Sequence, residues 1–243
     1  PRQRVVSDGD RTCGNPCPVV DDHTGTVFLL FCKDNQQAFL SGSKDEGETW
    51  SAPVEISPDV KDASWTYLGT GPGHGIQLTS GRLLVPAWAD ESPGPPTWRE
   101  PSATWGQVQS SVAFFSDDQG ESWQRGGKMT TNASDECEAV ETADGAVYMN
   151  MRSRQGKRQR AFSFSKDGGL TWSQVRFDSR LPEPSVQGSV TRLTRADEHG
   201  KNRVLLVVDI DGVAMPDRYA EFPLQAASRV KINECERTTA CTR

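Results

Sequence analysis

The chain has 243 residues, enough for one large domain or two small ones, and it contains 22 glycines and 15 prolines. This composition is typical of a turn-rich β protein, and no run of apolar residues is long enough to predict a transmembrane segment. The formal net charge of -6 argues against nucleic acid as the main partner. The three histidines lie far apart and give no metal signal, so we expect neither a metal nor another cofactor.

The first element in chain order is the segment 13–21, Cys-Gly-Asn-Pro-Cys-Pro-Val-Val-Asp, which leads into a predicted strand at 26–31. Its two cysteines lack the partners of a zinc pattern. For the six cysteines of the chain, buried free thiols are favoured over a disulfide framework, although the sequence leaves both open.

The next strand, predicted at 38–42, runs into the first of three copies of an eight-residue pattern. The copies are Ser-Lys-Asp-Glu-Gly-Glu-Thr-Trp at 43–50, Ser-Asp-Asp-Gln-Gly-Glu-Ser-Trp at 116–123 and Ser-Lys-Asp-Gly-Gly-Leu-Thr-Trp at 165–172. Aspartate and serine side chains bond nearby backbone groups, and glycine adopts positive φ, so each copy predicts a turn held by its aspartate. Their regular placement favours a structural role for these aspartates over a shared site.

Between the first and second copies, residues 69–78 read Gly-Thr-Gly-Pro-Gly-His-Gly-Ile-Gln-Leu, and a buried-strand pattern follows at 82–88. The glycines could cradle a phosphate, but the Lys-Ser/Thr ending and the following helix of a phosphate loop are absent. We favour a tight entry into a strand, with close approach of the backbone.

Between the second and third copies, a turn at 143–145 predicts a β-hairpin. Counting outward from this turn, Glu136 and Arg152 fall near each other at the open end of the hairpin. They would then share one rim of the sheet, where the inner strands of a propeller meet the central cavity. Two interpretations stay open, a solvated surface salt bridge of little energetic consequence and a functional pair.

The three copies begin 73 and 49 residues apart, and about 50 residues is typical of one four-stranded propeller blade. The longer interval contains a Pro/Gly/Ser-rich insertion at 91–106, which we expect to be a surface loop. We therefore predict an all-β propeller of about four to five blades, incomplete in this chain. We expect a partial propeller at 1–202 and a divergent strand and tail at 203–243.

Four segments, at 13–21, 69–78, 135–141 and 150–153, resemble in this order the exo-α-sialidases of the six-bladed propeller type. The repeated pattern is the Asp box of that family, which is only moderately specific on its own. The resemblance covers roughly residues 11–193. It implies a six-bladed β-propeller that hydrolyses terminal α-ketosidic sialic acid linkages by a retaining Tyr/Glu mechanism. The expected partners are sialylated glycoproteins, glycolipids and oligosaccharides.

The resemblance also implies roles for four residues of this sequence. Glu136 would take the proton of the tyrosine nucleophile, and Arg152 would be one of three arginines that bind the substrate carboxylate. Asn15 would line the N-acetyl pocket, and Trp88 would lie near the glycerol side chain.

The chain also departs from the family pattern. No position matches the first arginine of the triad or the acid/base aspartate, and Arg218 and Tyr219 lack the flanks of the third arginine and the nucleophile. An alternative is therefore a truncated, inactive sialidase-like propeller that binds carbohydrate or another partner. An unrelated Asp-box protein is disfavoured by the hairpin at 135–153. The compartment stays open, because the glycosylation sequon at Asn132 matters only in a secretory pathway.

Overall fold

The computed structural model describes residues 3–92, 108–129, 134–195, 199–200 and 202–208, together with the backbone of 229–234. The elements in this part of the chain are β1 (Cys13–Asp21), β2 (Thr26–Lys33), β3 (Gln37–Ser43), β4 (Val54–Glu55), α1 (Ser57–Val60), β5 (Tyr67–Thr70), β6 (Ile76–Gln77), β7 (Leu83–Asp90), β8 (Gln109–Ser116), β9 (Gln124–Arg125), β10 (Ser134–Glu141), β11 (Val147–Ser153), β12 (Gln159–Ser165), β13 (Arg176–Pro182), β14 (Gly188–Thr194), β15 (Arg203–Val208) and β16 (Arg229–Glu234).

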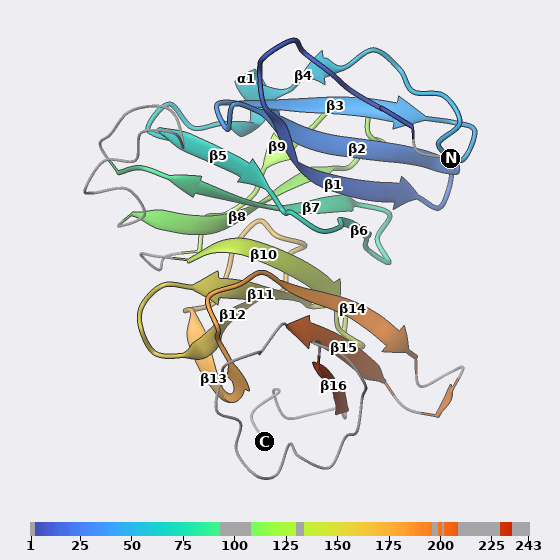
Figure 1. Cartoon of the computed structure of the whole chain (residues 1–243). Coiled ribbons are helices and arrows are strands. Elements are labelled where there is room, and N and C mark those ends of the chain that lie inside the picture. The colour runs from blue at the N-terminus through green and yellow to red at the C-terminus, as the bar shows by residue number, and fades with distance from the viewer. Residues whose placement is uncertain are drawn as a thin grey trace.

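These strands form four antiparallel sheets that follow one another along the chain (Figure 1). Their orders are β1-β2-β3-β4, β5-β7-β8-β9 with β6 paired to β7, β10-β11-β12-β13, and β14-β15-β16. Each sheet corresponds to one blade, so the predicted all-β, incomplete propeller is confirmed, with four blades in the part that the structure describes. No helix among the described residues is long and apolar enough to cross a membrane.

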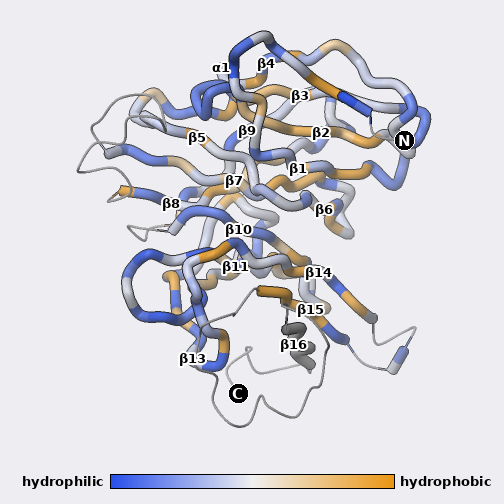
Figure 2. Tube along the Cα trace, in the orientation of Figure 1, coloured by the Kyte–Doolittle hydropathy of each residue, from blue (hydrophilic) through white to orange (hydrophobic). Residues whose placement is uncertain are grey.

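The sheets pack face to face through three apolar clusters. Leu30, Val85 and Phe114 lie between the first and second sheets, and Leu84 and Met149 lie between the second and third. Figure 2 shows apolar segments along β1, β2 and β7, where the first two sheets meet. All residues of β7 and β8 are buried. Burial on both faces explains why β7 reads as a nearly unbroken apolar run in the sequence.

The strand β15 pairs with β14 and therefore adds to the fourth sheet. The expected division between 1–202 and 203–243 stays a prediction. Most of the insertion at 91–106, the sequon at Asn132, and both Arg218 and Tyr219 lie outside the described residues.

Four of the six cysteines lie in the described part of the chain, and all four are free. The thiols at positions 17, 32 and 137 are buried, and the one at position 13 is partly buried. The preference for free thiols is therefore confirmed for these four, and the remaining two lie outside the described residues.

The three Asp boxes form the turns that the sequence predicts. In the first box, Asp45 Oδ1 accepts hydrogen bonds from the Thr49 backbone N–H at 2.8 Å and from the Ser43 hydroxyl at 2.8 Å. Trp50 folds back and donates to the Gly47 carbonyl at 3.0 Å. The aspartates of the other two boxes accept the corresponding bonds, so all three act on their own turns.

We expect Asp167→Ala, in the third box, to lower the free energy of unfolding by about 1–2 kcal/mol through loss of charge-assisted hydrogen bonds. Desolvation acts to raise the pKa of Asp167, but hydrogen bonds from Thr171 and Ser165 outweigh it and lower the pKa to about 2. The stabilisation should therefore be complete above about pH 4 and be lost as the pH falls toward 2. Urea unfolding at neutral and acidic pH measures this, with Lys166→Ala as the control. Equal unfolding free energies of the Asp167 variant and the wild type at neutral pH would contradict the prediction.

The boxes and the start of each sheet lie at opposite ends of the blades. Neighbouring strands are antiparallel, so the third strand of a sheet runs in the same direction as the first. Each box follows a third strand and hence lies where the first strand ends. We call the opposite end, where β1, β5 and β10 begin, the rim.

Candidate active site

The hairpin of β10 and β11 carries a bulge at the rim. Its turn is closed by the Thr142 backbone N–H, which donates to the Ala146 carbonyl at 2.7 Å. The strands pair regularly from there to Cys137, but the register shifts before Ser134, which pairs with Ser153. Two residues of β10, Asp135 and Glu136, therefore face one residue of β11, Arg152.

Glu136 and Arg152 come together as the sequence predicts. Arg152 Nη1 donates to Glu136 Oε2 at 2.8 Å. The side chains are only 24% and 19% exposed, so this is a largely buried pair open to solvent on one side. Such a pair differs from the fully solvated salt bridge that the sequence left open.

A second carboxylate, that of Asp135, lies close to Arg152. Its side chain is 1% exposed, and its Oδ2 lies 2.9 Å from Arg154 Nε and 3.6 Å from Arg152 Nη1. Burial raises the pKa of Asp135 to about 6, against the opposing effect of the two arginines. Sequence reasoning gave no role to Asp135 or Arg154, because regular counting from the turn leaves Asp135 outside the pair.

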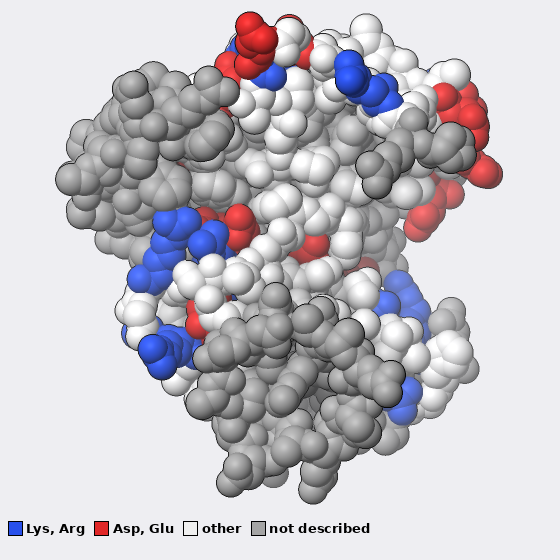
Figure 3. All heavy atoms as spheres, in the orientation of Figure 1, with Lys and Arg blue, Asp and Glu red and all other residues white. Residues whose placement is uncertain are grey.

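Figure 3 shows basic and acidic side chains side by side at the left of the sheet β10–β13, over the end of the hairpin. Among the described residues, no group of three or more His, Cys, Asp or Glu could hold a metal ion.

Asn15 and Trp88 also lie at the rim, against Gly69. The register of β1 shifts between Gly14 and Cys17, and Asn15 within this bulge has φ 53°. A Cβ atom on Gly69 would lie 2.4 Å from Trp88 Nε1 and 3.0 Å from Asn15 Nδ2. Only glycine leaves room there for both side chains, so the structure places these two predicted residues next to each other.

Tyr67 connects this pair to the hairpin. Its ring stacks on Trp88 with a centroid distance of 5.0 Å and an interplanar angle of 28°. Burial raises the pKa of Tyr67 to about 12, and the charges of Cys32 and Glu136 add to this effect while Arg154 opposes it. Sequence reasoning missed Tyr67, whose only signal was its position just before the glycine-rich segment.

Six buried side-chain polar atoms among the described residues have no hydrogen-bond partner, and two of them, Arg160 Nη2 and Trp172 Nε1, belong to residues outside the group at the rim. The other four are Trp88 Nε1, Arg152 Nε and both amide atoms of Gln109. Gln109 pairs with the last residue of β7 and lies on the same face as Trp88. Buried polar groups are normally satisfied, so water or a ligand can supply the missing partners of these atoms.

The glycine-rich segment makes the close approach that its sequence predicts. A Cβ atom on Gly73 would lie 1.7 Å from Glu138 Oε1. The buried Glu138 accepts hydrogen bonds from the backbone N–H groups of His74 at 3.2 Å and Val190 at 2.7 Å. Glu138 therefore ties the second, third and fourth sheets together beneath the rim, and the segment enters β6 as a tight turn.

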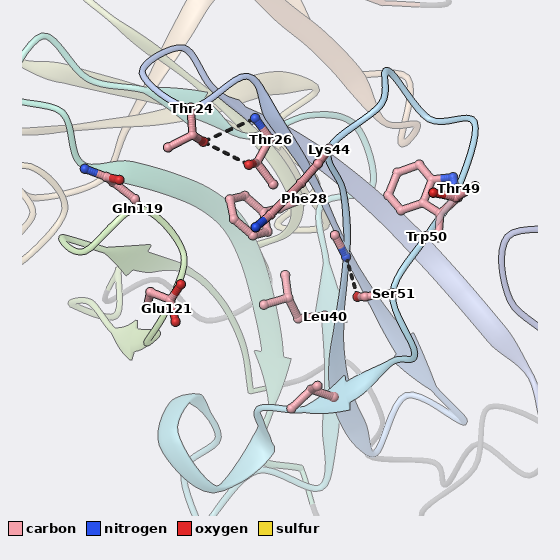
Figure 4. Close-up of a pocket in the computed structure, with 12 residues that line it drawn as sticks. Thr24, Thr26, Phe28, Leu40, Lys44, Thr49, Trp50, Ser51, Gln119 and Glu121 are labelled. Carbon is pink, nitrogen blue, oxygen red and sulfur yellow. Dashed lines mark hydrogen bonds between the residues drawn. The ribbon is translucent and has the colours of Figure 1, made fainter.

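A separate cavity of ≈ 660 Å³ lies at the box end (Figure 4). Phe28, Trp50 and Glu121 contribute to its walls. A Cβ atom on Gly120 would lie 2.3 Å from the Phe28 ring, so Phe28 packs against the second box. The cavity contains none of the predicted site residues and reflects the contact between the first two sheets.

The fold and the rim define an Asp-box propeller with a charged and aromatic site. Residues 1–211 match the family described as BNR repeat-like domain. The chain belongs to this family, and within it to the sialidases that carry Asp-box repeats.

Individual relatives agree with this assignment. Sialidase-4 of Mus musculus is 36% identical over 201 residues, which cover 72% of this chain and 40% of that protein. A sialidase of Bacteroides fragilis is 29% identical over 210 residues, which cover 78% of this chain and 36% of that protein. The solved structure of the Hadza microbial sialidase Hz136 superposes with a TM-score of 0.69 and 27% identity, covering 81% of this chain and 40% of the other. The chain spans 36–40% of the length of these two curated relatives.

Proposed function

We propose that the protein containing this chain is an exo-α-sialidase that hydrolyses terminal sialic acid linkages of glycoproteins, glycolipids and oligosaccharides. The observation that carries the proposal is the Glu136–Arg152 pair, held at 2.8 Å on the rim of a sialidase-type propeller. Similarity to sialidases from animals and bacteria supports it.

The chemistry of the substrate explains why these residue types suit the reaction. Sialic acid carries a carboxylate on its anomeric carbon, which would repel a carboxylate nucleophile. A neutral tyrosine avoids this repulsion, and a neighbouring glutamate activates the tyrosine by taking its proton. In the proposal Glu136 has this role, and the enzyme retains the anomeric configuration.

Arg152 would bind the substrate carboxylate. One of its terminal nitrogens already bonds Glu136, and its side chain is 19% exposed. A guanidinium presents five donors in a planar fork, so further N–H groups can bond a carboxylate while the bond to Glu136 persists. Asn15 and Trp88, packed around Gly69, would line the N-acetyl pocket and the region of the glycerol side chain.

Release of a fluorophore from a sialoside by the protein with its full natural sequence tests this function. We expect Arg152→Ala to raise KM about 10- to 100-fold, because it removes charge-assisted bonds to the carboxylate. Arg125→Ala, which removes an arginine paired with Asp62 on the surface, is the control. Wild-type protein without turnover would refute the function, and normal kinetics in Arg152→Ala would refute the role of Arg152.

The alternative is a carbohydrate-binding propeller without turnover. It is favoured by the absence, at any position of this sequence, of a match to the acid/base aspartate, the nucleophilic tyrosine and two arginines of the family. On this alternative the 243-residue chain binds a sialoside and releases no product. Robust hydrolysis by the isolated chain would exclude it.

A further inference from the structure

Four charged side chains meet at the bulge of β10. Asp135 Oδ2 lies 2.9 Å from Arg154 Nε and 3.6 Å from Arg152 Nη1, and Glu136 Oε2 lies 2.8 Å from Arg152 Nη1. One oxygen of Asp135 is thus shared by two guanidinium groups. The four charges sum to zero when all four groups are ionised.

Arg152, Arg154 and Glu136 form the partly exposed side of this cluster, and Asp135 lies beneath them. The side chains of the two arginines are 19% and 30% exposed, whereas the side chain of Asp135 is 1% exposed. The two arginine side chains therefore cover Asp135 and stay partly exposed themselves. A carboxylate ligand that reaches this surface meets two guanidinium groups, but it also adds a negative charge to a neutral, largely buried cluster. Such a charge is costly unless it is compensated.

We propose that Arg154 binds the carboxylate of the ligand together with Arg152, and that one proton from solvent is taken up by Asp135 when the ligand binds. The added proton balances the added negative charge, so the cluster stays neutral. The inference rests on the proposed function, because it concerns the carboxylate of the same substrate at the same site.

Asp135 is better placed than Glu136 to take the proton. It is the more buried of the two carboxylates, and burial already raises the pKa of Asp135 to about 6. A ligand carboxylate on the two arginines would weaken their hold on Asp135 and raise this pKa further.

Groups on neighbouring elements do not compete for the proton near neutral pH. Arg160 on β12 lies within electrostatic range of Asp135, but its charge is balanced by Glu183 at 2.8 Å. Burial raises the pKa of the Cys137 thiol well above its ordinary value, so the thiol stays neutral. Tyr67 on β5, with a pKa of about 12, is neutral as well.

Isothermal titration calorimetry of the protein with its full natural sequence tests whether ligand binding is coupled to proton uptake. The probe is the glycal of N-acetylneuraminic acid, which keeps the carboxylate, and its methyl ester is the uncharged control. At about pH 7.5, titrations in phosphate and Tris, whose ionisation enthalpies differ, should report uptake of about one proton for the acid and none for the ester. The affinity for the acid should fall by up to about tenfold per pH unit above the pKa of the free site.

Two variants test which residue takes up the proton and which residue binds the carboxylate. Asp135→Asn should bind the acid without proton uptake and with an affinity that hardly changes with pH. Arg154→Gln should weaken binding of the acid about tenfold and leave the ester unaffected. Arg158→Gln changes an exposed arginine in the connection between β11 and β12 and should alter neither.

Three results would overturn the inference. They are binding of the acid by wild-type protein without proton uptake, unchanged affinity in Arg154→Gln, and absence of binding. The wild-type titration shows whether a proton is taken up on binding even if the Asp135→Asn variant does not fold. Protein that takes up a proton on binding the acid but hydrolyses no sialoside would refute the proposed function alone.

Discussion

Glu136→Gln is expected to lower kcat for sialoside hydrolysis by about 10²- to 10⁴-fold, the range for losing a positioned general base. The amide is nearly isosteric with the carboxylate and can still accept the hydrogen bond that Arg152 donates at 2.8 Å. It cannot take the proton of a tyrosine nucleophile. The rim should therefore keep its shape, KM should change little, and the loss should fall on kcat.

Steady-state kinetics with a fluorogenic sialoside measure this effect in the protein with its full natural sequence. Glu121→Gln makes the same chemical change at an exposed position in the second Asp box and should leave kcat unchanged. Thermal unfolding of both variants checks that the fold is intact. A Glu136→Gln variant with wild-type kcat would remove Glu136 from the mechanism.

Arg160→Met is expected to lower the free energy of unfolding by about 3–5 kcal/mol, as is usual when one partner of a buried ion pair is removed. Arg160 is fully buried, and its Nη1 donates to Glu183 Oε2 and to the Val186 carbonyl, both at 2.8 Å. Its Nε donates to Asn150 Oδ1 at 2.8 Å. Methionine fills a similar volume but leaves the buried Glu183 without its cation.

Urea unfolding at neutral pH measures this loss. Arg125 pairs with Asp62 at 3.0 Å on the surface, so Arg125→Met should cost less than about 1 kcal/mol. The double variant Arg160→Met/Glu183→Met should recover part of the stability, because no unpaired buried charge is left. Equal losses of unfolding free energy in Arg160→Met and Arg125→Met would show that the buried pair contributes no more to stability than the exposed pair.

The buried Arg160–Glu183 pair also contacts the end of β11 at the rim. Glu183 Oε2 accepts the backbone N–H of Ser153 at 3.0 Å, and Ser153 follows Arg152 directly. Loss of Arg160 should therefore loosen the end of β11 as well as the sheet. Part of any loss of activity in Arg160→Met would follow from a displaced Arg152.

The sequence was sufficient for features that depend on nearby residues. The Asp boxes follow from turn chemistry within eight residues, and the strands before them follow from their apolar patterns. Counting from the turn at 143–145 places Glu136 opposite Arg152 because most of this hairpin is regular. The glycine at position 73 signals a close approach, which Glu138 makes.

Other features depend on contacts that sequence periodicity does not report. The segment 13–21 is itself a strand, β1, rather than only a lead into one, because it pairs with β2 along most of its length. The bulge that brings Asp135 onto Arg152 is a local break in the ladder, and regular counting passes over it. Tyr67 on the second sheet approaches the hairpin of the third sheet only because these two sheets pack together.

The Asp boxes have a consequence for the order in which the molecule forms. Each box closes its hydrogen bonds within eight residues, so little chain entropy is lost in making it. The rim joins distant parts of the chain: Thr70 bonds the Asn15 carbonyl across 55 positions, and Glu138 accepts from His74 across 64. Because the entropy of loop closure grows with separation, the box ends can form early and independently of one another. We therefore expect the rim to take shape only after whole sheets have docked, so that its assembly marks completion of the fold.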